Sequence, residues 1–406
     1  MARFGRVILG LAALLLAASA QAGQTVLLVS IDGFRADYLS RGLTPNLAAL
    51  AAGGVSAAMR PAFPSLTFPN HYTLVTGLYP DHHGIVENTM NDPAIAAHPH
   101  FTLSDHDANW DRAWWDEATP LWVTVQRQGG HSATMFWPGS ETDIQGVRPD
   151  HWLPYDKGMA DSDRVGQVLA WLDLPAAERP SFVTLYFDKV DTAGHHEGPD
   201  SQGVNQALGQ IDTAIGQLVQ GLKQRGIADK IDLIVVADHG MAALAPERTI
   251  FIDDIVSPAD IQIVTSSAMM SLAPVAGAEG RVEKALFAPH KHMSCRKRQD
   301  MPERLHYGSN PRIPPILCLA DVGWTITTHE SAAHQHGPYR GTHGFDNQAP
   351  EMAALFIARG PDFRPGLKHA PFDNVDLYPL MAKLLGVKPE KNDGKLADIE
   401  DMIVTR

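Results

Sequence analysis

Residues 25–31 read Thr-Val-Leu-Leu-Val-Ser-Ile, and Asp32-Gly33 follows directly. The run is apolar and rich in β-branched side chains, and polar and apolar positions do not alternate in it. Such a pattern is typical of a strand that is buried on both faces of a parallel sheet. We therefore predict a central strand here, with Asp32 placed where the strand ends.

The chain beyond this strand alternates between two kinds of segment. Apolar runs of strand length are separated by segments in which apolar residues recur at helical period. This order predicts an α/β fold whose largely parallel central sheet is covered by helices on both faces. The predicted strands are residues 131–136, 181–190, 231–237 and 351–358, and the predicted helices are residues 43–53, 69–76, 165–172, 206–224 and 374–385.

The alternation breaks between about residues 245 and 335, where proline, glycine and short segments replace it. We expect a smaller inserted subdomain with a hairpin, within one catalytic domain that spans residues 23–406. Both cysteines, Cys295 and Cys318, lie in this region. In an exported protein such a pair predicts a disulfide, with free buried thiols as the alternative.

The first residues have the features of a secretory signal peptide. Arg3 and Arg6 precede an apolar run over residues 7–18, and small residues follow it. We predict a signal peptide over residues 1–22 and a periplasmic or secreted protein; an uncleaved N-terminal anchor is the alternative. No later segment is long and apolar enough to predict stable membrane insertion.

The charge of the chain narrows the class of partner. It has 33 Lys and Arg against 46 Asp and Glu, a formal net charge of −13. Because there is no long basic run, binding along the phosphates of duplex nucleic acid is not expected. The expected partner is a small molecule, and the sequence leaves the oligomeric state open.

Carboxylates and imidazoles follow several of the predicted strands. Ligands of open α/β sheets lie at the carboxyl ends of the strands, so these side chains are expected to share one edge. Imidazole nitrogen and carboxylate oxygen are ligands that zinc favours, although other divalent metals also bind them. We predict one ion held by Asp191, His195 and His343 and a second held by Asp32, Asp238 and His239. Asp188 competes with Asp191, and His196 is an ambiguous neighbour of His195.

Thr67 is the predicted nucleophile. It lies just before Pro69, which suits the first turn of a helix, so its hydroxyl is expected at a helix N-terminus. Coordination to the second metal would lower the pKa of this alcohol and make it a usable nucleophile. The alternatives are that Thr67 only caps the helix, or that a neighbouring hydroxyl attacks instead, namely that of Ser65, Thr73 or Thr76.

A charge count indicates the type of bond. Two Zn²⁺ ions, three aspartates and one alkoxide sum to about zero, and the nucleophile segment contains no arginine. Arg35 is the nearest cation, but its position favours a contact with Asp37 or solvent. A singly charged phosphodiester or a pyrophosphate bond is therefore expected in preference to a monoester.

Long motifs in the chain are similar to those of a known family. The run FPNHYTLVTGLYPDHHG over residues 68–84, together with VSIDGFRADYL, DTAGHHEGP, ADHGM and GTHGFD, resembles the nucleotide pyrophosphatase/phosphodiesterase family of the alkaline phosphatase superfamily, in its compact bacterial form. The resemblance implies an alkaline-phosphatase-like fold, two Zn²⁺ ions and a covalent phosphothreonine intermediate. It assigns Thr67, with Asp32, Asp238 and His239, to the second zinc, and it implies that Asn88 contacts a phosphate oxygen.

The resemblance also implies a nucleotide-type substrate. Phe68 and Tyr155 fall where nucleotide-type members place two rings that sandwich a base, so hydrolysis is expected to release a nucleoside 5′-monophosphate. Two enzymatic alternatives stay open, a phosphodiesterase of lipid head groups and another hydrolase of the superfamily. A noncatalytic protein that binds phosphate esters is the alternative from a different class.

Overall fold

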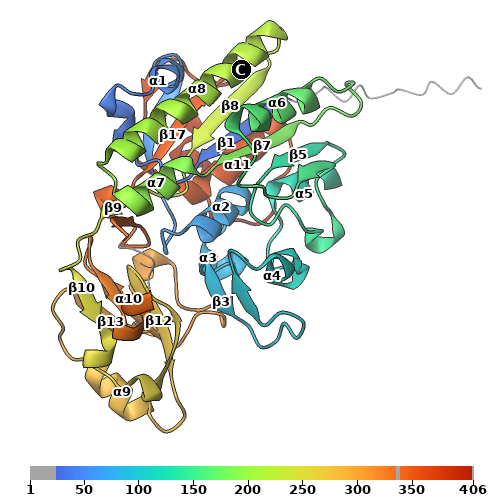
Figure 1. The fold of residues 1–406 in the computed structure, drawn as a ribbon. Helices are drawn as coiled ribbons and strands as arrows, with labels where there is room; N and C mark the ends of the chain where they lie inside the picture. The colour runs from blue at the N-terminus through green and yellow to red at the C-terminus, as the bar shows by residue number, and fades with distance from the viewer. Residues whose placement is uncertain (1–23, 335–338, 405–406) are drawn as a thin grey trace, which may run out of the picture.

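The computed structural model describes residues 24–334 and 339–404 (Figure 1). The predicted signal peptide, residues 1–22, lies outside the described residues. Within the described ranges, no helix combines the length and the hydropathy that a membrane span needs.

The described residues build a nine-stranded central sheet in the order β18-β2-β17-β8-β1-β7-β5-β6, and β19 also pairs with β2. β1 lies in the middle and is parallel to both neighbours, whereas β17 runs antiparallel to β8 and β2. The largely parallel sheet expected from the sequence is thus confirmed. The strands are β1 (Thr25–Ile31), β2 (Val55–Arg60), β5 (Ser132–Met135), β6 (His151–Leu153), β7 (Phe182–Phe187), β8 (Ile231–Val236), β17 (Ala354–Arg359), β18 (Leu367–Lys368) and β19 (Phe372–Asp373).

Two groups of helices surround this sheet. One group consists of α1 (Pro45–Ala52), α6 (Asp161–Leu172), α7 (Lys189–Glu197) and α8 (Gln202–Gln224), with α8 packed against the other three. The other consists of α2 (Thr67–Thr76), α5 (Leu121–Arg127) and α11 (Leu377–Leu385), which pack against one another. Figure 1 shows α8 lying across the front of the sheet. The architecture is the α/β fold that the sequence predicts.

The register of the central strands brings their carboxyl ends to one level. Ile31 at the end of β1 lies beside Phe187 at the end of β7, and Ser30 lies beside Val236 at the end of β8. The residues that follow these three strands therefore meet at a single edge of the sheet, as expected for parallel strands.

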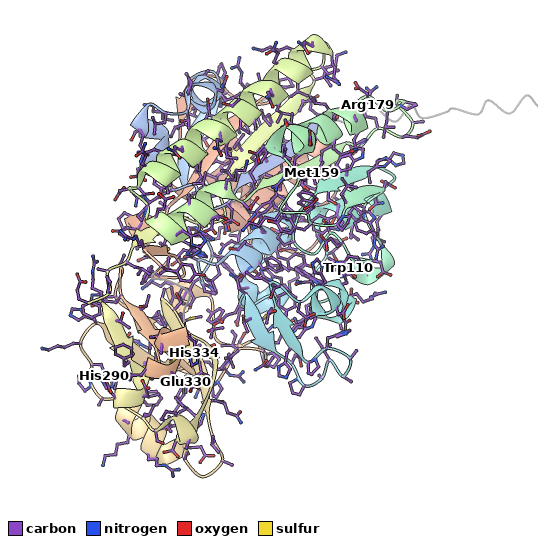
Figure 2. All side chains as sticks on the ribbon, viewed as in Figure 1. Trp110, Met159, Arg179, His290, Glu330 and His334 are labelled. Atoms are coloured by element: carbon purple, nitrogen blue, oxygen red, sulfur yellow. A yellow bond between two sulfur atoms is a disulfide. The ribbon has the colours of Figure 1, made fainter. Side chains whose placement is uncertain are left out.

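Residues 249–334 form a lobe, and most of its buried apolar residues form a core of their own (yellow to orange in Figure 1). Its main sheet is antiparallel, in the order β11-β12-β14-β13, and the disulfide Cys295–Cys318 links opposed residues of β13 and β14. The predicted pairing of the cysteines is thus confirmed. Figure 2 shows His290 and Glu330 on this lobe, away from Trp110 on the main body. Its elements are β10 (Thr249–Phe251), β11 (Ile261–Thr265), β12 (Met269–Pro274), α9 (Glu279–Leu286), β13 (Met293–Lys297), β14 (Ile316–Ala320), β15 (Thr325–Thr327) and α10 (His329–His334).

Two predicted strands have the wrong bounds. The strand predicted over 181–190 ends at Phe187, and α7 begins at Lys189. The strand predicted over 351–358 begins at Ala354, after a 3₁₀ turn over Pro350–Met352. In both places only a few residues separate the strand from a helical element, and periodicity over three or four residues does not distinguish the end of a strand from a helical turn.

Candidate active site

Two strands of the sheet deliver acidic and imidazole side chains to the same point. Asp32 follows β1, and Asp238-His239 follows β8, the parallel neighbour of β1. All three side chains are almost fully buried. Helix α7, the N-terminus of α2 and the segment that carries His343 complete the site.

The first cluster consists of Asp191, His195 and His343, whose ligand atoms all lie within 4.8 Å of one another. Asp191 and His195 are four residues apart on α7, so one helical turn aligns them. His343 follows β16 (Gly341–Thr342), which pairs with β9 (Ala242–Ala243) just beyond β8. The Nε2 atoms of His195 and His343 lie 3.4 Å and 3.6 Å from the same oxygen, Asp191 Oδ1.

The second cluster consists of Asp32, Asp238 and His239. His239 Nε2 lies 2.9 Å from Asp238 Oδ2 and 3.5 Å from Asp32 Oδ1. Each carboxylate is anchored through its other oxygen: the Tyr186 hydroxyl donates to Asp32 Oδ2 (2.6 Å), and the Gly33 N–H donates to Asp238 Oδ1 (3.1 Å). One oxygen of each aspartate therefore faces the cluster.

The histidines of both clusters are held in one tautomer. Each places Nδ1 at 2.9 Å from a backbone carbonyl oxygen: His195 from Gly341, His239 from Gly240 and His343 from Ser65. A carbonyl oxygen only accepts, so Nδ1 carries the hydrogen and Nε2 presents a lone pair. The Nε2 atoms of His195 and His343 lie only 3.1 Å apart. Two lone pairs at that distance repel each other unless a cation lies between them, which is the usual arrangement of metal-binding imidazoles.

Three buried carboxylate oxygens of the clusters also indicate a cation. Asp32 Oδ1, Asp191 Oδ1 and Asp238 Oδ2 are shielded from solvent and have no hydrogen-bond partner among the described residues. An ionised oxygen in that state is unfavourable unless a positive charge compensates it. The donor set and its unpaired atoms therefore fit divalent cations.

The pKa values express the same crowding of negative charge. Burial, with the nearby Asp238 and Asp191 carboxylates, raises the pKa of Asp32 well above its usual range, and burial raises the pKa of Asp191. Burial and the two neighbouring imidazoles hold the pKa of His343 well below its usual value. A cation between the carboxylates would remove their repulsion and favour their ionised forms.

Thr67 is the first residue of α2, and Leu66 precedes it as an extended N-cap residue. The Thr67 side chain is half-buried, and its Oγ1 lies 3.3 Å from His239 Nε2 in the second cluster. Below it, His71 Nδ1 donates to the Thr67 carbonyl (2.8 Å) and so anchors this turn of the helix. The Thr67 hydroxyl therefore lies beside the side chains of the second cluster, at the N-terminal, positive end of the α2 dipole.

The competing hydroxyls are engaged in other contacts. Thr73 and Thr76 are buried in α2, where Thr73 Oγ1 contacts His83 Nε2 and Thr76 Oγ1 donates to the Tyr72 carbonyl. Ser65 is buried and donates to the Phe345 carbonyl.

The other ambiguous side chains also have partners elsewhere. Asp188 pairs with Arg164 (2.9 Å), and Arg35 pairs with Asp37 (2.6 Å) as expected. His196 is exposed, and its ring contacts that of Tyr339.

Asn88 is placed next to the helix that carries Thr67. Its Oδ1 accepts the backbone N–H of Phe68 at 3.0 Å. The amide oxygen is used in this contact, so the amide NH₂ group is the part of Asn88 that can donate to a bound anion.

Phe68 and Tyr155 line a cavity of about 260 Å³, which we call the aromatic cavity. Asp32, Thr67 and Asp191 border it at the clusters. The sequence predicts only two of its rings; the six aromatic residues of the wall are Phe68, Trp115, Phe136, Trp137, Tyr155 and Tyr186. A flat apolar group bound there would lie next to the Thr67 hydroxyl.

Two polar residues of this cavity, Tyr186 and Glu141, are among those that sequence reasoning missed. Tyr186 is the only residue of β7 with a long polar tip, which was a usable signal, and it donates to Asp32. Glu141 accepts the backbone N–H of Tyr155 and the indole N–H of Trp110 through different oxygens. It had no sequence signal, because its partners lie 14 and 31 residues away in the chain.

The profile of one protein family, described as type I phosphodiesterase / nucleotide pyrophosphatase, matches residues 26–346. The chain belongs to this family. Its nucleotide pyrophosphatase/phosphodiesterase relatives include an uncharacterized pyrophosphatase/phosphodiesterase of Schizosaccharomyces pombe, 37% identical over 91% of this chain and 78% of the relative. A bis(5′-adenosyl)-triphosphatase of Xenopus laevis is 36% identical over 94% of this chain and 82% of the relative.

Solved structures agree with this assignment. Human ectonucleotide pyrophosphatase/phosphodiesterase 5 superposes with a TM-score of 0.89, at 36% identity, over 94% of this chain and 100% of that one. Murine ectonucleotide pyrophosphatase/phosphodiesterase 5 was solved as an inactive threonine-to-alanine variant in complex with AMP. It gives the same TM-score at 34% identity, over 94% of this chain and 100% of that one.

This nucleotide pyrophosphatase/phosphodiesterase is thus an enzyme with an alkaline-phosphatase-like α/β fold, as the motifs predicted. Phosphodiester hydrolysis is the reaction of its class, and the two clusters are candidate metal sites of a metallo-phosphodiesterase.

Proposed function

We propose that this enzyme is a zinc-dependent hydrolase that cleaves phosphodiester and pyrophosphate bonds of nucleotides and releases nucleoside 5′-monophosphates. One observation carries the proposal: the Thr67 hydroxyl lies 3.3 Å from a ligand atom of one donor cluster and opens into the aromatic cavity. A phosphate at the clusters and a base in the cavity would then belong to one bound nucleotide.

In this proposal, two Zn²⁺ ions are held by the two clusters. Asp191, His195 and His343 would hold one, and Asp32, Asp238 and His239 would hold the other together with Thr67. When bound, the ions would supply positive charge beside the Thr67 hydroxyl and the transferring phosphoryl group.

Thr67 is the proposed nucleophile. The Thr67 hydroxyl gives up its proton to water, and its Oγ1 forms a bond to phosphorus as the bond from phosphorus to the leaving oxygen breaks. This step gives a phosphothreonine and releases the leaving group, whose oxygen takes up a proton from water. A water oxygen then attacks the same phosphorus, Thr67 recovers its hydroxyl, and the nucleoside monophosphate is released. The position of Thr67 at the start of α2 favours the developing negative charge on its oxygen.

Three further residues would bind the substrate. The amide NH₂ of Asn88 would donate to a phosphate oxygen, since its Oδ1 is occupied by the Phe68 N–H. The rings of Phe68 and Tyr155 would stack on the base, a contact that tolerates different bases.

The relatives support a nucleotide substrate. The murine protein was solved with AMP after a threonine was replaced to inactivate it, and the Xenopus relative is named for hydrolysis of bis(5′-adenosyl) triphosphate. The preference for a nucleotide over a lipid head group rests on these relatives, because aromatic rings can bind both a flat base and the cation of choline.

We also propose that the protein is exported to the periplasm or beyond, with residues 1–22 as its signal peptide. The disulfide supports an oxidising compartment, because such bonds are rare in reducing ones. We treat residues 23–406 as one catalytic domain with an insertion at about 245–335, since most buried residues of the lobe form their own cluster while Met301, Leu305 and others pack into the main core.

The test is product analysis with purified enzyme. Bis(5′-adenosyl) triphosphate and the p-nitrophenyl ester of thymidine 5′-monophosphate should yield AMP and TMP, and a chelator should stop both reactions. p-Nitrophenyl phosphorylcholine represents the lipid head groups. A higher kcat/KM on the choline ester than on both nucleotides would contradict the proposal, and so would a failure to release AMP and TMP.

A further inference from the structure

A second cavity, of about 350 Å³, borders the clusters on the side of the lobe formed by residues 249–334. Its wall joins Asn88, His195 and His343 to the turn between β11 and β12. We call it the hydroxyl cavity, because five of its lining residues carry hydroxyl groups: Thr89, Thr265, Ser266, Ser267 and Thr342. It has no lining residue in common with the aromatic cavity.

The two cavities approach the clusters from different sides. Thr67 lines the aromatic cavity, whereas His195 and His343 of the first cluster line the hydroxyl cavity. In phosphoryl transfer the attacking and leaving oxygens lie roughly in line through phosphorus. A phosphorus atom attacked by Thr67 therefore directs its leaving group away from that hydroxyl, toward the first cluster and the space beyond it.

The walls of the hydroxyl cavity are polar but, apart from the ion proposed at His195 and His343, they supply no permanent positive charge. None of its described lining residues is Lys or Arg, and its one acidic residue, Glu87, is buried. The Ser267 and Thr342 hydroxyls lie 3.2 Å apart and join the lobe to the segment that carries His343. Hydroxyl groups can both donate to and accept from sugar hydroxyls, whereas a leaving phosphate would bring charge into a space where no side chain compensates it.

We propose that the hydroxyl cavity is the leaving-group subsite, and that it takes a neutral, hydroxyl-bearing alcohol such as the sugar of a nucleoside. The inference rests on the proposed function, because it assumes attack by Thr67 on a nucleotide phosphorus. It adds a preference that the proposed function does not contain: a phosphodiester whose leaving group is a nucleoside is a better substrate than a pyrophosphate whose leaving group is anionic.

The experiment compares two substrates that release the same product. Adenylyl-(3′→5′)-adenosine yields AMP with adenosine as leaving group, and ATP yields AMP with pyrophosphate as leaving group. The p-nitrophenyl ester of thymidine 5′-monophosphate has a small leaving group and reports on the aromatic cavity and the clusters. The wild type is expected to have the higher kcat/KM on the dinucleotide.

Two variants probe the wall, and a third is the control. Ser267→Leu fills the cavity and should lower kcat/KM on the dinucleotide about tenfold, with a change of less than about threefold on the p-nitrophenyl ester. Ser266 is exposed, so Ser266→Lys preserves the fold and should raise the ratio of ATP to dinucleotide activity about fivefold by adding a cation. Ser294→Leu changes an exposed lobe residue that does not line the cavity and should leave all three substrates unaffected.

The outcomes separate the two proposals. If the wild type releases no nucleoside monophosphate from any of the three, the proposed function fails and this inference fails with it. If it does, but Ser267→Leu affects all substrates equally or Ser266→Lys leaves the ratio unchanged, the inference alone is overturned. An unchanged thermal unfolding midpoint in both variants rules out misfolding as the cause.

Discussion

Side chains that face the clusters are held in place by hydrogen bonds to neighbouring groups as well as by their own backbone. The Asp32 carboxylate shows this: the buried Tyr186 hydroxyl donates to one of its oxygens and leaves the other facing the cluster. The three cluster histidines are oriented in the same manner, through Nδ1 and a carbonyl. Contacts of this type set both ligand orientation and tautomer, so the site can hold its geometry before substrate arrives.

Replacement of Thr67 tests the proposed nucleophile. Thr67→Ala should lower kcat on nucleotide esters about 1,000-fold or more, because no covalent intermediate can form. Metal content, measured by elemental analysis, should stay unchanged, since six other ligands remain. Thr73→Val, a buried hydroxyl of the same helix, should keep kcat within about threefold and lose only stability. Comparable activity of Thr67→Ala and wild type would refute the assignment.

If Phe68 and Tyr155 stack on a base, replacing either ring should raise KM only for substrates that carry a base. Phe68→Ala and Tyr155→Ala should each raise KM for nucleotide esters about tenfold, since one base stack contributes about 1–3 kcal/mol. Bis(p-nitrophenyl) phosphate has no base, so its KM should change far less. Equal losses on both substrates would show that the rings do not stack on a base.

Glu87 predicts a dependence of stability on pH. Burial raises its pKa to about 8, and the Thr265 and Ser271 hydroxyls oppose the rise. The unfolded chain releases this proton above its usual value of 4.5, whereas the folded protein keeps it up to about pH 8. The folded state thus holds more protons between these values, and stability falls as pH rises across the interval.

Glu87→Gln removes this titration. The variant should gain stability relative to the wild type by about 3–5 kcal/mol between pH 5 and pH 8.5. Urea unfolding at both pH values, with the metal content held constant, measures the difference. The exposed Glu279→Gln is the matched control and should give parallel curves. A pH-independent difference between Glu87→Gln and wild type would contradict the titration.

At the scale of elements, the site depends on close approach between a loop and a helix. Gly33 follows β1 with φ +67°, and a Cβ added there would lie 2.9 Å from Asp191 Cα. Only glycine permits this approach of the β1 end to α7 without displacing the Asp191 backbone. The short pair β9–β16 has a similar role, since it brings His343 next to α7.

The disulfide is an element-scale feature with its own prediction. Cys295 and Cys318 are 23 residues apart and join two adjacent strands of the lobe. Replacing both by serine should destabilise the protein by about 3 kcal/mol, because the unfolded chain loses a closed loop. Activity at 25 °C on the p-nitrophenyl ester should be retained. Thermal unfolding measures the loss, and the wild type under reducing conditions should match the variant.

At the scale of the whole molecule, metal binding should couple to folding. The clusters draw ligands from β1, α7, β8 and the segment after β16, so bound ions connect distant parts of the chain. Removal of the ions should abolish hydrolysis and lower stability by at least about 3 kcal/mol. Addition of Zn²⁺ should restore both.

Elemental analysis measures how many metal ions each protein molecule binds. The wild type should contain about two equivalents of metal, and His343→Ala about one. His196→Ala, the exposed neighbour of His195, should keep both and serves as the control. Wild-type activity in a protein without bound metal would contradict the prediction.

Much of the fold and part of the candidate site were predictable from local patterns in the chain. Strands such as β1 and β8 are continuous apolar runs, and Asp191 and His195 have the spacing of one helical turn. These features depend on neighbours in the sequence, and backbone geometry converts them directly into structure. The family motifs are equally local, which is why the fold, the family and the enzyme class were predicted correctly.

Contacts between distant segments decided the rest. No periodicity indicates that Glu141 anchors Tyr155, that the β11–β12 turn reaches Asn88, or where the aromatic and hydroxyl cavities lie. Cavities are the spaces that packing leaves between elements, and unpaired buried oxygens such as Asp32 Oδ1 are recognisable only once their surroundings exist. Composition and spacing therefore establish which chemical groups are present, whereas long-range packing sets the distances between them, and those distances determine the chemistry.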